Sequence, residues 1–278
     1  MSAIARLKKI IDRPVVRSVV APVMSQLARS EGRGVRRIFY EDGVWIHETS
    51  GGYFAYPHPY VRLDLEQFEQ AAKRNFFWGY QPGPGDVVMD IGAGVGEETL
   101  TFSRAVGDRG VVVCVEAHPR TFRCLEKLVK YNRLKNVQAV QGAVTGPSCS
   151  AVVIEDCDEY LANRLNSGHG FTVPATTIDA ICARLNVDHI DFLKMNIEGA
   201  ERFAIQGVGQ TLKKVGAFCI SCHDFLAGDE SLRTKALVRK FLADNGFEVA
   251  GREDERLPPY LRDQVWGYQR TRTGVRLA

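Results

Sequence analysis

The stretch VVMDIGAGVGE, residues 87–97, decides the fold of this chain. A short apolar run ends in an acid, Asp90, and glycines follow at the alternate positions 92, 94 and 96. Residues 98–105 then continue in a helical pattern. A strand, a glycine turn and a helix in this order form the opening unit of a nucleotide-binding α/β domain, because glycine tolerates a positive φ and lets a ligand lie against bare backbone.

Strands and helices alternate from this stretch towards the C-terminus. We predict seven strands, at 87–90, 110–116, 137–140, 191–195, 216–222, 247–249 and 265–268. The predicted helices are 97–106, 120–133, 177–186, 199–214 and 230–245. This alternation predicts a mostly parallel seven-stranded sheet with helices on both faces. Residues 145–175 interrupt the alternation, and we expect an insertion with a small hairpin there.

The first 80 residues differ from the rest, so we predict an N-terminal extension at 1–80 and a main domain at 81–278. Residues 1–37 hold nine basic and two acidic residues, with apolar residues at helical spacing that Pro14 and Pro22 interrupt. One interpretation is a helix that lies on an anionic membrane surface. We favour the other, a helix that docks on the domain or on a second copy of the chain in a homodimer.

Residues 38–60 predict a β-hairpin followed by an extended loop, and a helical pattern follows from 63 to 80. The aromatic residues of this region either line a ligand site or attach the extension to the core of the main domain, and both interpretations stay open. These residues are Tyr53, Tyr56, His58 and Tyr60.

Composition sets further bounds. A chain of 278 residues with 45% hydrophobic residues can build one large domain and an extension, and a net charge of +3 is too small to argue for nucleic acid. The seven cysteines are scattered, and the closest pair, Cys219 and Cys222, lies in an apolar run, which indicates reduced core cysteines. We therefore expect a cytoplasmic protein, which also agrees with the lack of a membrane-spanning apolar run and of a signal-peptide core.

The residues around the glycine turn limit the choice of cofactor. A phosphate-binding loop needs a lysine with a serine or threonine after its last glycine, and Glu97 and Glu98 stand there instead. Two carboxylates also repel a pyrophosphate, whereas they suit the sulfonium and ammonium groups of S-adenosylmethionine, which we expect near Asp90 and Glu97. Glu116 ends the second strand, where a carboxylate accepts hydrogen bonds from ribose hydroxyls, and Gly142 follows the third strand, where an adenine edge would lie.

Residues 90–97 resemble motif I of the class I S-adenosylmethionine-dependent methyltransferases. More specifically, residues 173–179, residues 191–201 and His223 are similar to the FkbM-type methyltransferase family, and the resemblance covers roughly residues 86–250. It implies a Rossmann-like fold, S-adenosylmethionine as cofactor, and methyl transfer to hydroxyls of sugars and polyketide-type natural products. The family usually has Asp where this chain has Asn196. The predicted cofactor-binding residues are Asp90, Gly92, Ala93, Gly94, Gly96, Glu97, Thr99, Glu116, Ala117, Gly142, Ala143 and Asn196.

Methyl transfer to oxygen requires a group that accepts the hydroxyl proton, and strand ends supply the candidates. His223 is the best base by residue type, although a histidine there also caps a strand end. Glu198 is predicted to anchor substrate hydroxyls, because a helix N-terminus favours its ionised form. Asn196 is the third candidate for catalysis or an N-cap, and Glu201 is predicted to serve only as a helix N-terminal charge. A metal-assisted route, with Asn196, Glu198, His223 and Asp224 as ligands of a divalent ion, is ranked well below base catalysis, because no ligand spacing demands a metal.

The sequence offers two alternatives to a small-molecule O-methyltransferase. An RNA or protein methyltransferase is disfavoured because the basic cluster is confined to the N-terminus, so we expect a small-molecule or glycan acceptor and no nucleic acid. A non-catalytic binding module is disfavoured by the intact Asp90, glycine turn and Glu116. We expect residues 38–60 and 145–175 to select the hydroxyl that is methylated.

Overall fold

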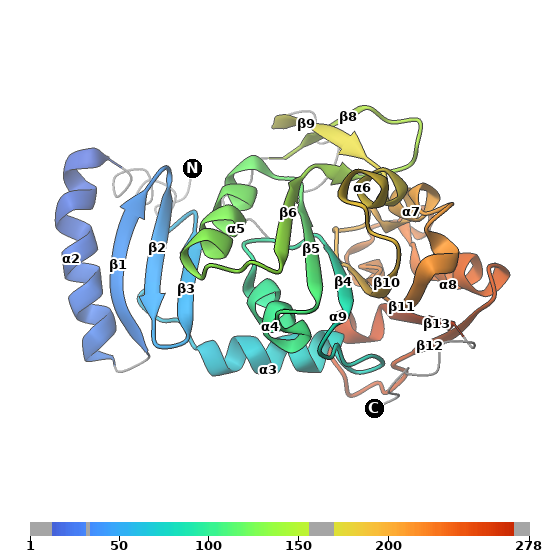
Figure 1. Ribbon diagram of the computed structural model, residues 1–278, viewed down its shortest axis with the longest axis horizontal. Coiled ribbons are helices and arrows are strands. Elements are labelled where there is room, and N and C mark those ends of the chain that lie inside the picture. The colour runs from blue at the N-terminus through green and yellow to red at the C-terminus, as the bar shows by residue number, and fades with distance from the viewer. Residues whose placement is uncertain (1–12, 32–33, 156–169, 270–278) are drawn as a thin grey trace.

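The computed structural model describes residues 13–31, 34–155 and 170–269. A seven-stranded sheet lies at its centre, with the strand order β12-β13-β11-β10-β4-β5-β6 (Figure 1). Every strand pair is parallel except those of β13, which runs antiparallel to both neighbours. The prediction of a mostly parallel seven-stranded sheet is confirmed. The strands are β4 (Val87–Ile91), β5 (Val111–Glu116), β6 (Val137–Gln141), β10 (Ile190–Met195), β11 (Val215–Ser221), β12 (Phe247–Gly251) and β13 (Gln264–Gln269).

Helices cover both faces of this sheet, as predicted. Because successive side chains of a strand point to opposite faces, Phe192 of β10 packs in one core cluster with Trp266, and Leu193 packs in the other with Phe218. Both clusters are buried, so neither face of the sheet is left to solvent. The helices of this part are α4 (Glu97–Val106), α5 (Pro119–Tyr131), α6 (Ile178–Leu185), α7 (Glu201–Ala204), α8 (Lys235–Asp244) and α9 (Pro259–Arg262).

The predicted helix 199–214 is wrong. Only α7 is α-helical, and two 3-10 turns follow, Ile205–Gly207 and Leu212–Lys214. The carboxylate of Asp179 accepts hydrogen bonds from the backbone N–H groups of Gln210 and Thr211, each at 2.8 Å. These N–H groups therefore do not form the hydrogen bonds of an α-helix, and the chain turns at this point. The helix predicted at 230–245 likewise begins only at Lys235, because Asp224 caps the N–H of Thr234 at 2.7 Å.

The insertion follows directly after the carboxyl end of β6. It comprises β7 (Ala143–Val144), β8 (Ala151–Ile154) and β9 (Phe171–Thr176), which form a small sheet of order β7-β9-β8. Strands β8 and β9 pair antiparallel, as in the expected hairpin, and β7 pairs with β9 in parallel.

The N-terminal extension is a helix packed on a small sheet. Helix α2 (Pro14–Ser30) covers an antiparallel sheet of β1 (Val35–Glu41), β2 (Val44–Thr49) and β3 (Gly52–Tyr56), and α3 (Leu65–Phe76) leads to the main domain (Figure 1). The sheet therefore has one strand more than the predicted hairpin. The predicted interruption at Pro22 is also wrong, because α2 runs through it and is held to β1 by Ser25, whose hydroxyl accepts from the N–H of Ile38 at 2.8 Å. Residues 1–12 lie outside the described residues, and a membrane contact or a homodimer stays a prediction.

The aromatic residues of the extension pack within it and against the main domain. The hydroxyl of Tyr56 donates to Glu97 at 2.8 Å, and the backbone N–H of Tyr53 donates at 2.9 Å to the side chain of Asn132, the C-cap of α5. The rings of His47 and Tyr60 each lie against the Tyr56 ring. These contacts support the interpretation that the aromatics pin the extension to the core. Within the described ranges, no helix is long and apolar enough to cross a membrane.

Candidate active site

A cavity lies at the carboxyl ends of β4, β5, β6 and β10. Seven of the twelve predicted cofactor-binding residues line it. These seven are Gly92, Gly94, Glu116, Ala117, Gly142, Ala143 and Asn196.

The glycine turn forms one wall of this cavity. The N–H groups of Gly92 and Ala93 both donate to the Val115 carbonyl, at 2.9 and 3.1 Å, which fixes the turn beside β5. Gly92 has a φ of +76°, and a Cβ there would lie 2.0 Å from the backbone oxygen of Asn196. Gly94 also has a positive φ, but a Cβ there would meet nothing within 4 Å. Gly92 is therefore required by close packing, whereas Gly94 leaves bare backbone open to a ligand.

Glu116 is the carboxylate of this cavity. Its two oxygens accept hydrogen bonds from the N–H groups of Gly94 and His118, at 2.9 and 2.8 Å. Burial raises the pKa of Glu116 to about 7. A carboxylate has about four acceptor positions, so Glu116 can still accept from two ribose hydroxyls. The carboxylate, the open backbone at Gly94 and the apolar walls fit the nucleoside part of S-adenosylmethionine.

Asp90 is placed differently from the prediction. It is fully buried, and its Oδ1 accepts a hydrogen bond of 2.7 Å from the Lys194 ammonium, which also donates to the Gly92 carbonyl at 2.8 Å. Burial lowers the pKa of Lys194, but the charges of Asp90 and Glu98 raise it more, so the lysine stays charged. The charge of Asp90 is therefore balanced beneath the turn and does not face the cavity. The signal that sequence reasoning missed is a lysine inside the buried strand next to the one that carries Asp90.

Four more predicted cofactor residues do not line the cavity. Glu97 faces a separate hollow between α4 and the extension, where Tyr56 binds it. Thr99 is buried with its hydroxyl 3.3 Å from the Cys114 sulfur, and Gly96 is the left-handed N-cap of α4. Ala93 is buried in the core. These residues shape the turn and the start of α4.

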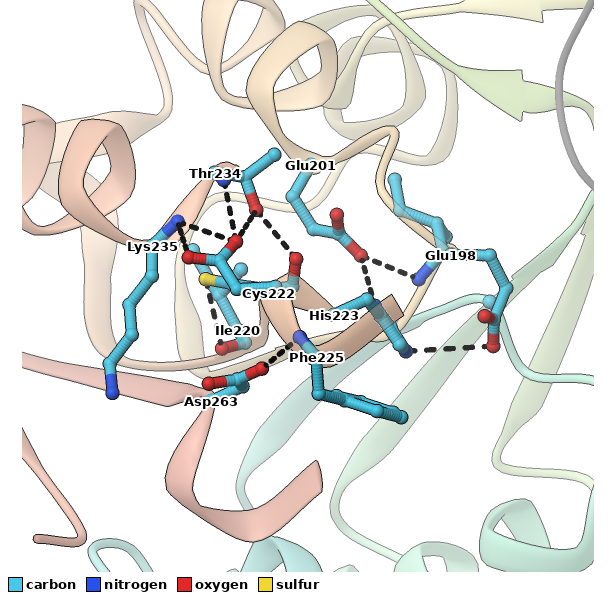
Figure 2. A network of polar contacts seen from close by, with 12 residues as sticks. Glu198, Glu201, Ile220, Cys222, His223, Phe225, Thr234, Lys235 and Asp263 are labelled. Carbon is cyan, nitrogen blue, oxygen red and sulfur yellow. Dashed lines mark hydrogen bonds and ion pairs between the residues drawn. The ribbon is translucent and has the colours of Figure 1, made fainter. Parts of the chain in front are cut away.

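A second polar cluster, formed by Glu198, His223 and Glu201, lies beside this cavity (Figure 2). His223 Nδ1 is 3.1 Å from Glu201 Oε1, and Nε2 is 3.5 Å from Glu198 Oε1. The side chain of Glu201 is completely buried, whereas that of Glu198 is 23% exposed. Glu201 also accepts from the N–H of Ile197 at 3.1 Å, so it fixes the imidazole to the loop after β10. Glu201 is thus a partner of His223, beyond the helix charge predicted for it.

Two members of this cluster are candidates for the base. Burial lowers the pKa of His223, but the hydrogen bond and charge of Glu201 and the charge of Glu198 raise it more, so the net pKa is raised. The carboxylate of Glu198 is the member of the cluster that lines the cofactor cavity, so it is a second candidate for the base beside His223. Both Glu198 and His223 have a positive φ, +53° and +54°, a conformation that costs non-glycine residues about 1–2 kcal/mol.

Asn196 lines the cofactor cavity, and its backbone N–H donates to the Ile91 carbonyl at 3.0 Å. A direct part for Asn196 in catalysis stays a prediction. In the part of the chain that the structure describes, no group of three or more His, Cys, Asp or Glu side chains is arranged to hold a metal ion.

The sheet topology, the glycine turn, the acid that ends β5 and the family match together define a Rossmann-like class I methyltransferase that uses S-adenosylmethionine. The sequence matches the methyltransferase FkbM domain over residues 90–249, more than half of the chain, and the protein belongs to this family. No curated protein sequence matches the chain.

Solved structures of similar fold include an FkbM methyltransferase from Methylobacillus flagellatus, with 16% identity and a TM-score of 0.44 over 66% of this chain and 43% of that one. Fibrillarin from Aeropyrum pernix, with natively bound S-adenosylmethionine, has 16% identity and a TM-score of 0.43 over 84% and 98%. The fibrillarin pre-rRNA processing protein of Methanococcus jannaschii has 14% identity and a TM-score of 0.46 over 84% and 97%. Likeness at this level concerns the fold alone.

Proposed function

We propose that this protein transfers a methyl group to a hydroxyl of a sugar, a glycoside or a related natural product, and that Glu198 accepts the hydroxyl proton. The observation that carries the proposal is the place of Glu198, which lines the cofactor cavity and also contacts His223. A general base must lie within reach of the hydroxyl that attacks the methyl group, and the cavity wall is such a place. The family resemblance supports oxygen as the atom that is methylated.

Each member of the cluster has a distinct part in this reaction. Bound S-adenosylmethionine supplies an electrophilic methyl group on a sulfonium sulfur. Glu198 takes the proton from the acceptor hydroxyl, and His223, whose Nε2 lies 3.5 Å from Glu198 Oε1, orients that carboxylate. Glu201 holds the imidazole in place from the buried side. A reducing cytoplasm is part of the same proposal, because the six cysteines among the described residues are free.

The test is the variant Glu198→Gln, which keeps the shape of the side chain and removes its basicity. Methyl transfer from labelled S-adenosylmethionine to a panel of sugars and glycosides is measured, and the methylated atom of the product is identified by NMR. We expect kcat to fall roughly 10²- to 10⁴-fold. The affinity for S-adenosylhomocysteine, measured by calorimetry, is expected to change by no more than about twofold, since Glu198 is not the ribose ligand.

The matched control is Glu253→Gln, because Glu253 is an exposed carboxylate outside both the cavity and the cluster. It is expected to leave kcat unchanged. Full activity of Glu198→Gln contradicts the assignment of the base. Transfer to RNA or protein, with none to the small hydroxyl compounds, contradicts the proposed acceptor class.

A further inference from the structure

A second cavity adjoins the cofactor cavity across the turn after β10. Glu198 and Ala200 line both cavities, and Gly199 between them lines the second. His223 lies in the wall of the second cavity as well. A molecule in this space therefore has the Glu198–His223 pair on one side and only a single turn between it and the cofactor.

The rim of the second cavity is apolar and exposed. Leu226, Leu232 and Phe203 line it with 44%, 49% and 42% of their surface exposed. Phe225 stands next to them, 45% exposed, with its ring 6.0 Å from that of His223. Large apolar side chains grouped at the mouth of a cavity usually mark a binding site, because isolated exposure is common but clustering is not.

The rim is also held in place rather than loosely attached. The N–H of Phe225 donates to the Asp263 carboxylate at 2.7 Å, and Asp224 accepts from the N–H of Thr234 at 2.7 Å (Figure 2). The segment folds as the 3-10 turns Asp224–Leu226 and Glu230–Leu232. A preformed apolar rim lowers the ordering cost of binding a molecule with an apolar face.

The wall of this cavity offers few cationic groups to an anionic ligand. Among the described residues that line it, the basic side chains are Arg202 and His223, and His223 already pairs with the carboxylates of Glu198 and Glu201. The guanidinium of Arg202 lies over the Phe203 ring, 4.9 Å from its centroid. Phosphate binding normally uses several cationic or backbone donors, so this wall suits an uncharged ligand. The thiol of Cys222, whose pKa burial raises, adds a neutral surface.

We propose that this second cavity is the acceptor site, and that it takes an uncharged alcohol with a broad apolar face rather than a phosphorylated sugar or a nucleic acid. The hydroxyl end of the acceptor lies towards Glu198 and His223, and the apolar face lies against Phe203, Leu226 and Leu232. This inference rests on the proposed function. It assigns selection of the acceptor to residues 198–232, whereas the sequence suggested residues 38–60 and 145–175.

The experiment measures binding to the full-length protein saturated with S-adenosylhomocysteine. The probes are a panel of 4-nitrophenyl glycosides, the free sugars that correspond to them, and their 1-phosphates. We expect at least one aryl glycoside to bind roughly tenfold or more tightly than its free sugar and its 1-phosphate, since only the glycoside is both uncharged and apolar on one side. Tighter binding of a 1-phosphate, or no binding of any glycoside, overturns the proposal.

A pair of variants locates the binding site. Leu226→Asp places a charge on the rim, and Leu237→Asp places it on α8, outside the cavity, at a leucine with almost the same exposure of 45%. Leu226→Asp is expected to weaken glycoside binding roughly tenfold, and Leu237→Asp to leave it within about twofold. Equal effects of the two variants overturn the assignment of the site.

The two proposals fail in different ways. If the protein methylates hydroxyls but Leu226→Asp does not change the KM for the acceptor, the second cavity is not the acceptor site. The proposed function is then still supported. Glycoside binding that responds to Leu226→Asp, with no methyl transfer to oxygen, removes the proposed function and leaves the cavity as a binding site for uncharged amphipathic alcohols.

Discussion

Two clusters, each of which combines acidic with basic side chains, lie at neighbouring strand ends. They differ in the number of carboxylates per basic group and in their exposure to the cavities. Beneath the glycine turn, one carboxylate, Asp90, meets one ammonium, Lys194, and both are at most 1% exposed. After β11, two carboxylates share one imidazole, and one of them, Glu198, reaches two cavities. The first cluster is closed, so it supports the fold. The second has a carboxylate, Glu198, that reaches the cavities, which is what a proton acceptor needs.

The largest expected effect comes from breaking the closed cluster. Lys194→Met leaves Asp90 as a buried charge without its cation, and we expect a loss of about 3–5 kcal/mol in the free energy of unfolding, measured by urea denaturation. The double variant Asp90→Asn/Lys194→Met should recover most of this loss. As a surface control, Lys73→Met removes the exposed Lys73–Glu69 pair and should cost less than about 1 kcal/mol. A small effect of Lys194→Met on the free energy of unfolding contradicts a structural role for the Asp90–Lys194 pair.

A pair of glycine variants compares the closed and open sides of the turn. Gly92→Ala and Gly94→Ala both place alanine at a positive φ, at a cost of about 1–2 kcal/mol each. Only at Gly92 would the new methyl group meet backbone, so Gly92→Ala should be less stable than Gly94→Ala by about 1–3 kcal/mol. Gly94→Ala should instead weaken S-adenosylhomocysteine binding, because it fills space in the cofactor cavity. Equal stability of the two proteins, measured by urea unfolding, contradicts this description of the turn.

A third prediction concerns the charge of the open cluster. In the native protein the pKa of His223 lies above its ordinary value, so His223 stabilises the fold fully below pH 6.5 and this contribution is lost as the pH rises through the raised pKa. Glu201→Gln removes the carboxylate that raises it most, and burial should then bring the pKa of His223 down. NMR titration of the imidazole, assigned with His223→Gln, measures the shift. An unchanged pKa in Glu201→Gln excludes Glu201 as its cause.

The sequence predicted the main sheet well because its signals are local. Each strand of the main domain is a short apolar run next to a turn, and the stretch around Gly92 identifies both the fold and the family. The helix expected at 199–214 failed because a distant side chain, Asp179, takes two of its N–H groups. Pro22 likewise predicted a break in the helix, but α2, which packs on β1, continues through this proline.

The site was predicted only in part, for a related reason. Glu116, Glu198 and His223 were found from residue type and strand position, and seven cofactor residues line the cavity. The partners of these side chains come from elements far apart in the sequence. Lys194 is 104 residues from Asp90, and Glu201 is 22 residues from His223. Such pairings fix which carboxylate is neutralised and which stays free, and no local pattern in the chain encodes them.

The turn that carries Glu198 has a thermodynamic consequence. Because the same residues face both cavities, a ligand that shifts this turn in one cavity changes the binding free energy in the other. Binding linkage then requires reciprocity: the factor by which the methyl donor changes the affinity for the acceptor equals the factor by which the acceptor changes the affinity for the donor. Glu198, in this turn, has a left-handed backbone conformation, which is unusual for a residue other than glycine. If the second cavity binds the acceptor, as proposed, donor and acceptor share this one structural element.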